Sequence, residues 1–132
     1  MSAPIASAGS EAAVSTGGVT GVHHVSIGVL DVDASVEFFG WLGLTQLPRP
    51  DFGFPGAWLQ AGGQQVHLIG TNVVPPGIEN HFAFLVGDLD VVLETLRANG
   101  VKANRSPRTM GAGQQAFVKD PSGNIIELNQ PD

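Results

Sequence analysis

Four side chains that can bind a metal ion recur at matching places in the two halves of the chain. His24 is followed by two aspartates and a glycine at offsets of 7, 9 and 19 residues, and His81 is followed by the same residue types at the same offsets. Each half then ends in a second potential ligand, His67 in the first and Glu127 in the second. Imidazole nitrogens and carboxylate oxygens bind Zn, Ni, Mn, Fe and Cu ions. The pattern predicts one divalent metal ion held by two repeated modules.

The strands expected to carry these residues alternate so that the ligands share one face. Large apolar side chains alternate with smaller or polar ones in residues 22–30, 64–69, 81–86 and 124–129. This period of two predicts strands, whose successive side chains point to opposite faces. The bulky residues fill the face that packs on a helix, and the four ligands lie in the other register. If the two sheets face each other, the ligands can meet in one cleft.

Each half also carries one segment that predicts a helix. Residues 31–44 begin with aspartates that can cap a helix and end near Gly43. Residues 88–99 begin with an aspartate and are followed by Gly100. Between the helices and the last strands we expect a loop or irregular strand over residues 45–56, a hairpin over 57–69 and a polar loop over 102–113. Each half is therefore β-α-β-β-β, and the fold class is α+β.

These elements predict a single domain made of two modules. Module one spans residues 20–70 and module two spans residues 78–130, within a domain of residues 19–132. The linker between them is rich in proline. Residues 1–18 are mostly Ala, Ser and Gly, and we expect a flexible tail there.

Composition excludes several classes of function. The net charge is −6, and the six Lys and Arg form no basic stripe of the kind that binds nucleic acid. The chain has no cysteine, so it can form neither a thiolate metal site nor a thiol nucleophile. No apolar run approaches the ~20 residues that span a bilayer, and the N-terminus lacks the basic start and apolar stretch of a secretory signal. We expect a cytoplasmic protein that acts on a small-molecule substrate.

Four stretches of the chain resemble the vicinal oxygen chelate superfamily. This superfamily includes glyoxalase I, extradiol dioxygenases, methylmalonyl-CoA epimerase, fosfomycin-resistance transferases and bleomycin-binding proteins. The stretches are HHVSIGVLDVDASVEFFGWLGL, QQVHLIG, HFAFLVGDLDVVLETLRANGV and DPSGNIIELNQP. They cover nearly everything from Gly21 to Pro131. The resemblance implies paired βαβββ modules whose sheets form an incomplete barrel around a divalent metal, with ligands at His24, His67, His81 and Glu127.

The ligand set leaves more than one reaction open. Bacterial glyoxalase I usually has a glutamate at the place of His67, where it moves the substrate proton. Here Glu127 remains as the carboxylate base, so the resemblance implies a glyoxalase I-like lyase or isomerase that acts through a metal-stabilised enolate, with Glu127 and His67 as catalytic residues. Alternatively, His24, His81 and Glu127 form the two-His-one-carboxylate triad of Fe(II) dioxygenases. The second alternative is a non-catalytic drug- or metabolite-binding resistance protein, although such members generally lack the ligand set.

Candidate substrate contacts lie in two loops. An arginine beside a metal cleft can hold a carboxylate or phosphonate, although a solvated arginine is an equally common outcome. Aromatic residues of the first loop can line a pocket or attach the loop to the core, and we favour the core for Trp58. His23 is expected to be structural. Because a half-barrel exposes unpaired strand edges, we expect a homodimer. The predicted substrate-binding residues are Arg49, Phe54, Arg105, Arg108 and Gln115.

Overall fold

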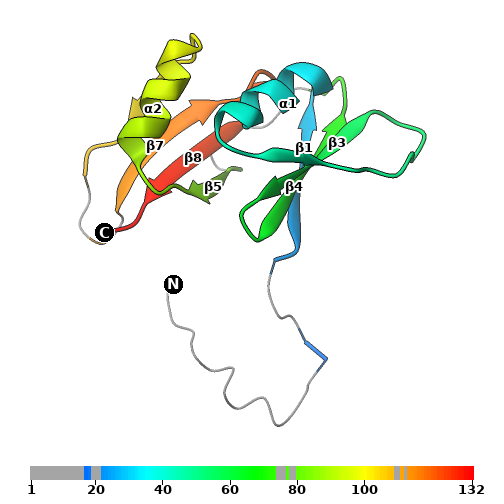
Figure 1. The fold of residues 1–132 in the computed structure, drawn as a ribbon, viewed down its shortest axis with the longest axis horizontal. Helices are drawn as coiled ribbons and strands as arrows, with labels where there is room; N and C mark the ends of the chain where they lie inside the picture. Colours follow the sequence, from blue (N-terminus) through cyan, green and yellow to red (C-terminus); the bar gives the residue numbers. More distant parts are fainter. Residues whose placement is uncertain (1–16, 19–21, 74–76, 78–79, 109–110, 112) are drawn as a thin grey trace.

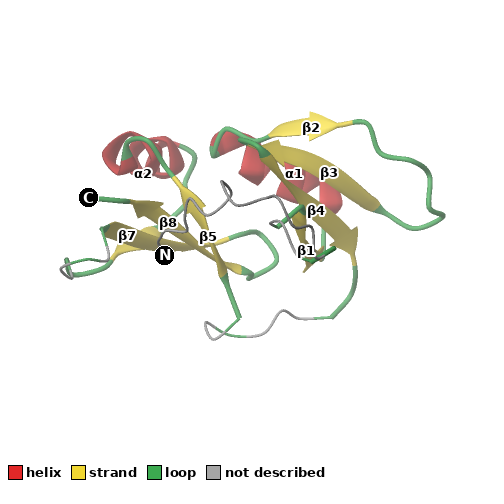
Figure 2. Cartoon of the chain, turned by 90° about the horizontal axis from the view of Figure 1, so that it is seen from below, coloured by secondary structure: helices red, strands yellow, loops and turns green. Residues whose placement is uncertain are grey.

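Two four-stranded sheets, each with its own helix, lie side by side in this protein (Figures 1 and 2). The computed structural model describes residues 17–18, 22–73, 77, 80–108, 111 and 113–132. Most of the predicted tail and part of the predicted linker lie outside these residues. In the part of the chain that is described, neither helix has the length and apolar character of a membrane span.

The strands follow the duplicated order that the sequence predicts. Sheet one has the strand order β1-β4-β3-β2, and sheet two has the order β5-β8-β7-β6. The first and last strands of each module pair in parallel, and the other pairs are antiparallel. The two sheets stay separate, so the predicted α+β fold with an open barrel is confirmed. The strands of sheet one are β1 (His24–Val29), β2 (Thr45–Leu47), β3 (Gly56–Ala61) and β4 (Gln64–Gly70). Those of sheet two are β5 (Phe82–Leu85), β6 (Ala103–Arg105), β7 (Gln114–Lys119) and β8 (Ile125–Gln130).

The strand β6 is a correction to the predicted loop of residues 102–113. It pairs with β7, with Arg105 opposite Ala116. Three residues are too few for a period of two to be recognised, so pairing with a neighbour decides the structure of this segment. The same reason applies to β2, which opens the segment predicted as loop or irregular strand.

Both helices begin at the predicted aspartate caps. The helix α1 (Val32–Trp41) follows Asp31, whose carboxylate accepts a hydrogen bond from the Ala34 amide at 3.0 Å. The helix α2 (Leu89–Ala98) follows Asp88, which accepts from the Val91 amide at 3.2 Å. These bonds satisfy amides that a helix start otherwise leaves unpaired. Just beyond the helices, Gly43 and Gly100 adopt positive φ angles of 97° and 78°.

The apolar register of the sheets packs against these helices in one core. In module one Phe38 and Phe39 of α1 are fully buried, and in module two Leu89 and Leu96 of α2 are fully buried. They pack with alternate residues of the strands. The buried strand residues are Val29, Ala57, Leu59, Val66, Leu68, Ala116, Val118, Ile126 and Leu128. Because this register is used for the core, the opposite register is left for the candidate site.

The tight turn between β7 and β8 holds the two modules together. The Ser122 hydroxyl accepts a hydrogen bond from the Leu30 amide at 2.6 Å, and the Asn124 side chain donates to the Gly28 carbonyl at 2.8 Å. Within the turn, the buried Asp120 carboxylate accepts from the amides of Ser122 and Asn124. Burial raises the pKa of Asp120, and its hydrogen bonds with Asn124 and Ser122 oppose that rise. The DPSGN sequence therefore has a structural role as the joint between the sheets.

Candidate metal and substrate site

The two predicted ligands of module one lie together on the face of sheet one that is turned away from α1. His24 lies on β1 and His67 on the neighbouring β4. Their rings stack with centroids 3.8 Å apart and planes 15° apart. His67 Nε2 forms a hydrogen bond with Gln65 Oε1 at 2.8 Å, which fixes the orientation of its ring. His24 Nδ1 lies 2.9 Å from His23 Nδ1. His23, expected to be structural, is thus in contact with a predicted ligand.

Protonation of His67 is disfavoured by its surroundings. Burial lowers its pKa below the usual 6.5, and electrostatic interactions with His24, His23 and Arg49 lower it further. A neutral imidazole is the form that binds a metal ion. The lowered pKa therefore favours the form of His67 that can bind a cation or accept a proton.

The two predicted ligands of module two form a second pair. His81 Nε2 lies 3.1 Å from Glu127 Oε1. Gln115 donates to Glu127 Oε2 at 2.9 Å, and Asn129 donates to the same oxygen at 3.1 Å. Burial alone would raise the pKa of Glu127, but hydrogen bonds from Asn129, Gln115 and His81 outweigh it and hold the pKa below 4.5. Gln115, predicted as a substrate contact, here orients the carboxylate.

The two pairs remain separate within one chain. Among the described residues, no three His, Asp or Glu side chains are close enough to hold a metal ion together. The structure thus brings the predicted ligands together in two pairs, one pair on each sheet. The positions are equivalent: His67 and Glu127 lie at matching places on β4 and β8, and His24 and His81 lie at the beginning of their modules. Each sheet thus presents two of the four predicted ligands.

Aromatic rings extend the stack of histidines on sheet one. Trp58 lies on β3 opposite His67, with ring centroids 4.5 Å apart and planes 10° apart. The preference for Trp58 in the core was therefore wrong. The signal was present in the sequence, because Ala57 and Leu59 take the buried register of β3 and leave Trp58 on the ligand face. Phe52 follows next, 6.0 Å from Trp58.

Of the predicted substrate arginines, one lies beside the candidate site. The guanidinium carbon of Arg49 is 5.0 Å from the ring centroids of both Phe52 and Phe54. Arg105 instead forms an ion pair with Asp90 and a hydrogen bond with Gln114.

Arg108 forms an ion pair with Asp132. Within the described residues, neither Arg105 nor Arg108 has a hydrogen bond or ion pair with a predicted metal ligand. Because surface carboxylates already neutralise them, they are poorer candidates for substrate binding than Arg49.

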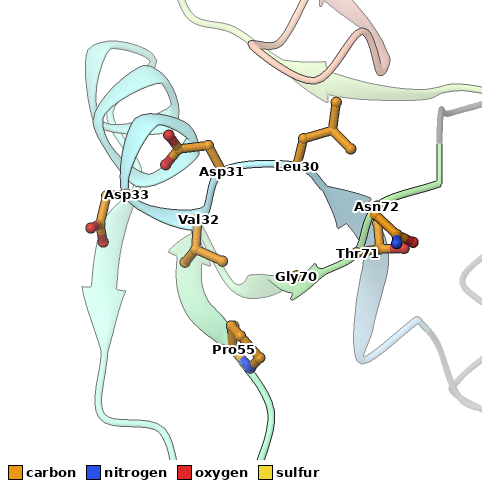
Figure 3. A pocket seen from close by; sticks show the side chains of 9 residues that line it. Leu30, Asp31, Val32, Asp33, Pro55, Gly70, Thr71 and Asn72 are labelled. Carbon is orange, nitrogen blue, oxygen red and sulfur yellow. The ribbon is translucent and has the colours of Figure 1, made fainter.

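A hollow of about 880 Å³ lies elsewhere, where β1 passes into α1 (Figure 3). Leu30, Asp31, Pro55 and Thr71 line it, and none of the four predicted ligands does. Asp31 is occupied there as the cap of α1. The hollow is therefore separate from the candidate site.

Comparisons with known proteins agree with this architecture. The family model described as Glyoxalase/Bleomycin resistance protein/Dioxygenase superfamily matches residues 21–128. The lactoylglutathione lyase GLX1 of Arabidopsis thaliana is 30% identical to the chain, in an alignment that covers 81% of this chain and 43% of the plant protein. The chain thus spans less than half the length of that curated relative.

Solved structures show the same fold. A glyoxalase family protein of Bacillus anthracis superposes with a TM-score of 0.78 at 24% identity, covering 86% of this chain and 97% of the other. The fosfomycin resistance protein FosX of Listeria monocytogenes superposes with a TM-score of 0.77 at 18% identity, covering 86% and 94%. That FosX structure contains Mn(II) and a dihydroxypropylphosphonic acid.

Proposed function

Because the chain belongs to the Glyoxalase/Bleomycin resistance protein/Dioxygenase superfamily, we propose that it is a divalent-metal-dependent enzyme. The proposed reaction is a lyase or isomerase step of the glyoxalase I type, on a small substrate with two neighbouring oxygen atoms. One observation carries the proposal: each module presents a pair of metal-type donors at the same place on its sheet. The similarity to a plant lactoylglutathione lyase supports the reaction class, and the Mn(II) of FosX supports a metal ion.

We propose further that the metal site is completed between two copies of the chain. His24 and His67 of one copy would face His81 and Glu127 of the other. The separation of the two pairs within one chain supports this arrangement. Leu85 supports it as well, because it lies on β5 in the same register as Ala83, the neighbour of Glu127, and is 81% exposed. Burial of such an exposed apolar side chain against a second copy would stabilise the dimer. In a twofold dimer the arrangement gives two equivalent sites.

The donors have the chemistry that a divalent cation requires. The lowered pKa of His67 keeps its imidazole neutral, and the lowered pKa of Glu127 keeps its carboxylate ionised at neutral pH. Zn, Ni, Mn, Fe and Cu all accept such a mixed nitrogen and oxygen set. Imidazole lone pairs lie in the ring plane, so the nearly parallel rings of His24 and His67 cannot both be directed at one ion. Binding therefore requires one of these rings to turn.

The chain's own residues can carry the proton transfer. When bound, the cation supplies Lewis acidity that makes the carbon next to a substrate oxygen more acidic. Glu127 is ionised, so it can accept the proton released from this carbon and return it to the neighbouring carbon. Gln115 and Asn129 hold one of its oxygens and so fix the direction of the carboxylate. The neutral ring of His67 can donate to or accept from a substrate oxygen, and Trp58 keeps water from one face of that ring.

Metal analysis followed by a substrate panel tests the proposal. The purified protein is expected to contain a stoichiometric divalent metal, and its nickel or zinc form is expected to convert a glutathione hemithioacetal. Glu127→Gln should abolish conversion while keeping the fold, as judged by circular dichroism. Iron together with oxygen consumption on a catechol would instead establish the dioxygenase alternative. A protein that binds no metal and transforms none of the hemithioacetal, epoxide and catechol substrates would refute the enzyme proposal.

A further inference from the structure

A small pocket lies directly beside the stacked histidines of sheet one. It is a cavity of about 170 Å³ on the ligand face. Three aromatic rings, one imidazole and one guanidinium form most of its wall, and none of the described acidic residues lines it. This is notable in a chain with 12 Asp and Glu against six Lys and Arg. The polar and aromatic residues of its lining are Ser26, Arg49, Phe52, Phe54, Trp58 and His67.

The guanidinium of Arg49 has a defined place in this pocket. It lies 5.0 Å from the centroids of both Phe52 and Phe54, whose rings stack 5.9 Å apart. A guanidinium near aromatic rings is attracted by their π electrons. Its N–H groups that do not face the rings can still donate hydrogen bonds to a ligand. Gly56 makes room for it, because a Cβ there would lie 2.8 Å from a terminal nitrogen of Arg49.

The positive charge of Arg49 is not neutralised by the described part of the chain. There Arg97, Arg105 and Arg108 each form an ion pair with a carboxylate, whereas Arg49 forms neither an ion pair nor a side-chain hydrogen bond. A guanidinium presents parallel donors that match the two oxygens of a carboxylate or phosphonate. An unpaired arginine in an aromatic pocket without acidic residues is therefore suited to an oxyanion that also carries a flat apolar group.

We propose that this pocket binds an aromatic oxyanion, with the carboxylate or phosphonate on Arg49 and the ring against Phe52 and Trp58. The proposal rests on the proposed function, since it names the substrate class of the same site. Trp58 stacks on His67, so a ligand in the pocket lies next to a proposed metal ligand. The oxygen-bearing end of the substrate would extend from the pocket past His67.

Trp58 provides a direct measurement of binding. The chain has two tryptophans, and the other is Trp41, which packs on Phe38 in α1. In a Trp41→Phe background, benzoate and phenylphosphonate should each quench Trp58 fluorescence, and the tighter of the two identifies the oxyanion. Acetate, which lacks a ring, and benzamide, which lacks the charge, should each bind at least tenfold more weakly than the tighter aromatic anion.

Substitution of Arg49 separates its charge from its structural role. Arg49→Met should weaken the aromatic anion about tenfold, which corresponds to about 1.4 kcal/mol, and leave benzamide unchanged. Arg49→Lys should recover part of the loss. The matched control is Arg97→Met, because Arg97 is exposed and paired with Glu94 on α2. The affinity of the Arg97→Met variant for the aromatic anion should equal that of the parent protein.

Several results would overturn the proposal. They are equal binding of acetate and benzoate, an equal effect of Arg49→Met on benzoate and benzamide, and a lowered melting temperature of Arg49→Met with unchanged benzoate affinity. The last result would mean that Arg49 only attaches its loop. Metal content is measured on the same samples, with and without a chelator. Benzoate binding in a protein that takes up no metal would support the anion pocket and refute the proposed metal-dependent enzyme. Metal uptake without benzoate binding would support the proposed metal site and refute the anion pocket.

Discussion

Complementation between two inactive variants gives a direct test of a site shared by two chains. The first variant, His24→Ala with His67→Ala, removes both donors of module one. The second, His81→Ala with Glu127→Gln, removes those of module two. The structure gives two donors per module, so either variant alone leaves every site with two ligands instead of four. We expect neither variant to retain a metal ion at micromolar protein concentration.

In a mixed dimer the outcome differs between the two possible sites. One site combines the two damaged modules and has no intact donor pair, while the other combines the two intact modules and has all four donors. Random pairing makes half of the dimers mixed, and each has one good site of two, so about a quarter of the wild-type metal content and activity returns. A mixed dimer isolated through two different affinity tags should hold about half the metal of the wild-type dimer.

Metal content is measured by mass spectrometry of the isolated dimers, and activity by any assay that the substrate panel supplies. Circular dichroism of each variant controls for loss of fold. If the site lay within one chain, no combination of these variants would restore four donors, and the mixed dimer would be as empty as its parents. That result, or retention of metal by either parent, would refute the shared site.

Three further predictions concern stability. Ser122→Ala leaves the Leu30 amide without its acceptor, and should lower the free energy of unfolding by about 1–2 kcal/mol, measured by urea denaturation. Gly113→Ala should cost more than about 1 kcal/mol, since φ is +74° and the new Cβ would lie 2.7 Å from the Gln130 carbonyl oxygen. Burial lowers the pKa of His67 below 6.5, so the unfolded state binds more protons and the metal-free protein should lose stability as pH falls through 6.5 toward the folded pKa. His67→Gln should flatten that part of the pH profile.

Each of these has a matched control. The Thr95 hydroxyl donates to the Val91 carbonyl within α2, so Thr95→Ala should cost less than the change at Ser122. Gly63→Ala has open space around its Cβ and no positive φ, and should be nearly neutral. A denaturation profile of His67→Gln that still falls below pH 6.5 as steeply as the parent would assign the acid sensitivity to another group.

The fold was predictable because its signals are local and repeated. The alternation in β1, β4 and β8 and the aspartates before both helices are visible in the sequence, and the structure confirms them. The family prediction is confirmed as well, by a match over residues 21–128. The short strands β2 and β6 were not predicted as regular strands, because three residues are too few to show alternation and their structure depends on pairing with a neighbouring strand.

The candidate site was predictable in its parts. The registers of His24, His67, His81 and Glu127 follow from alternation, but how two sheets are placed relative to each other does not. That placement depends on contacts far apart in sequence, such as Ser122 with Leu30. The partners of the arginines are also set by tertiary structure, which is why Arg49 alone of the predicted three lies in the pocket beside His67.

At the turn between β7 and β8, module two supplies the side chains that join the modules and module one supplies only backbone groups. The matching turn of module one is Gly62–Gly63, which has no side chains and cannot make such bonds to module two. The two halves share one structural plan, but they differ at this turn. A chain assembled from two copies of residues 20–70 would lack both of these hydrogen bonds between the modules. In the native chain the two bonds go to backbone atoms, the Leu30 amide and the Gly28 carbonyl, and not to side chains of module one.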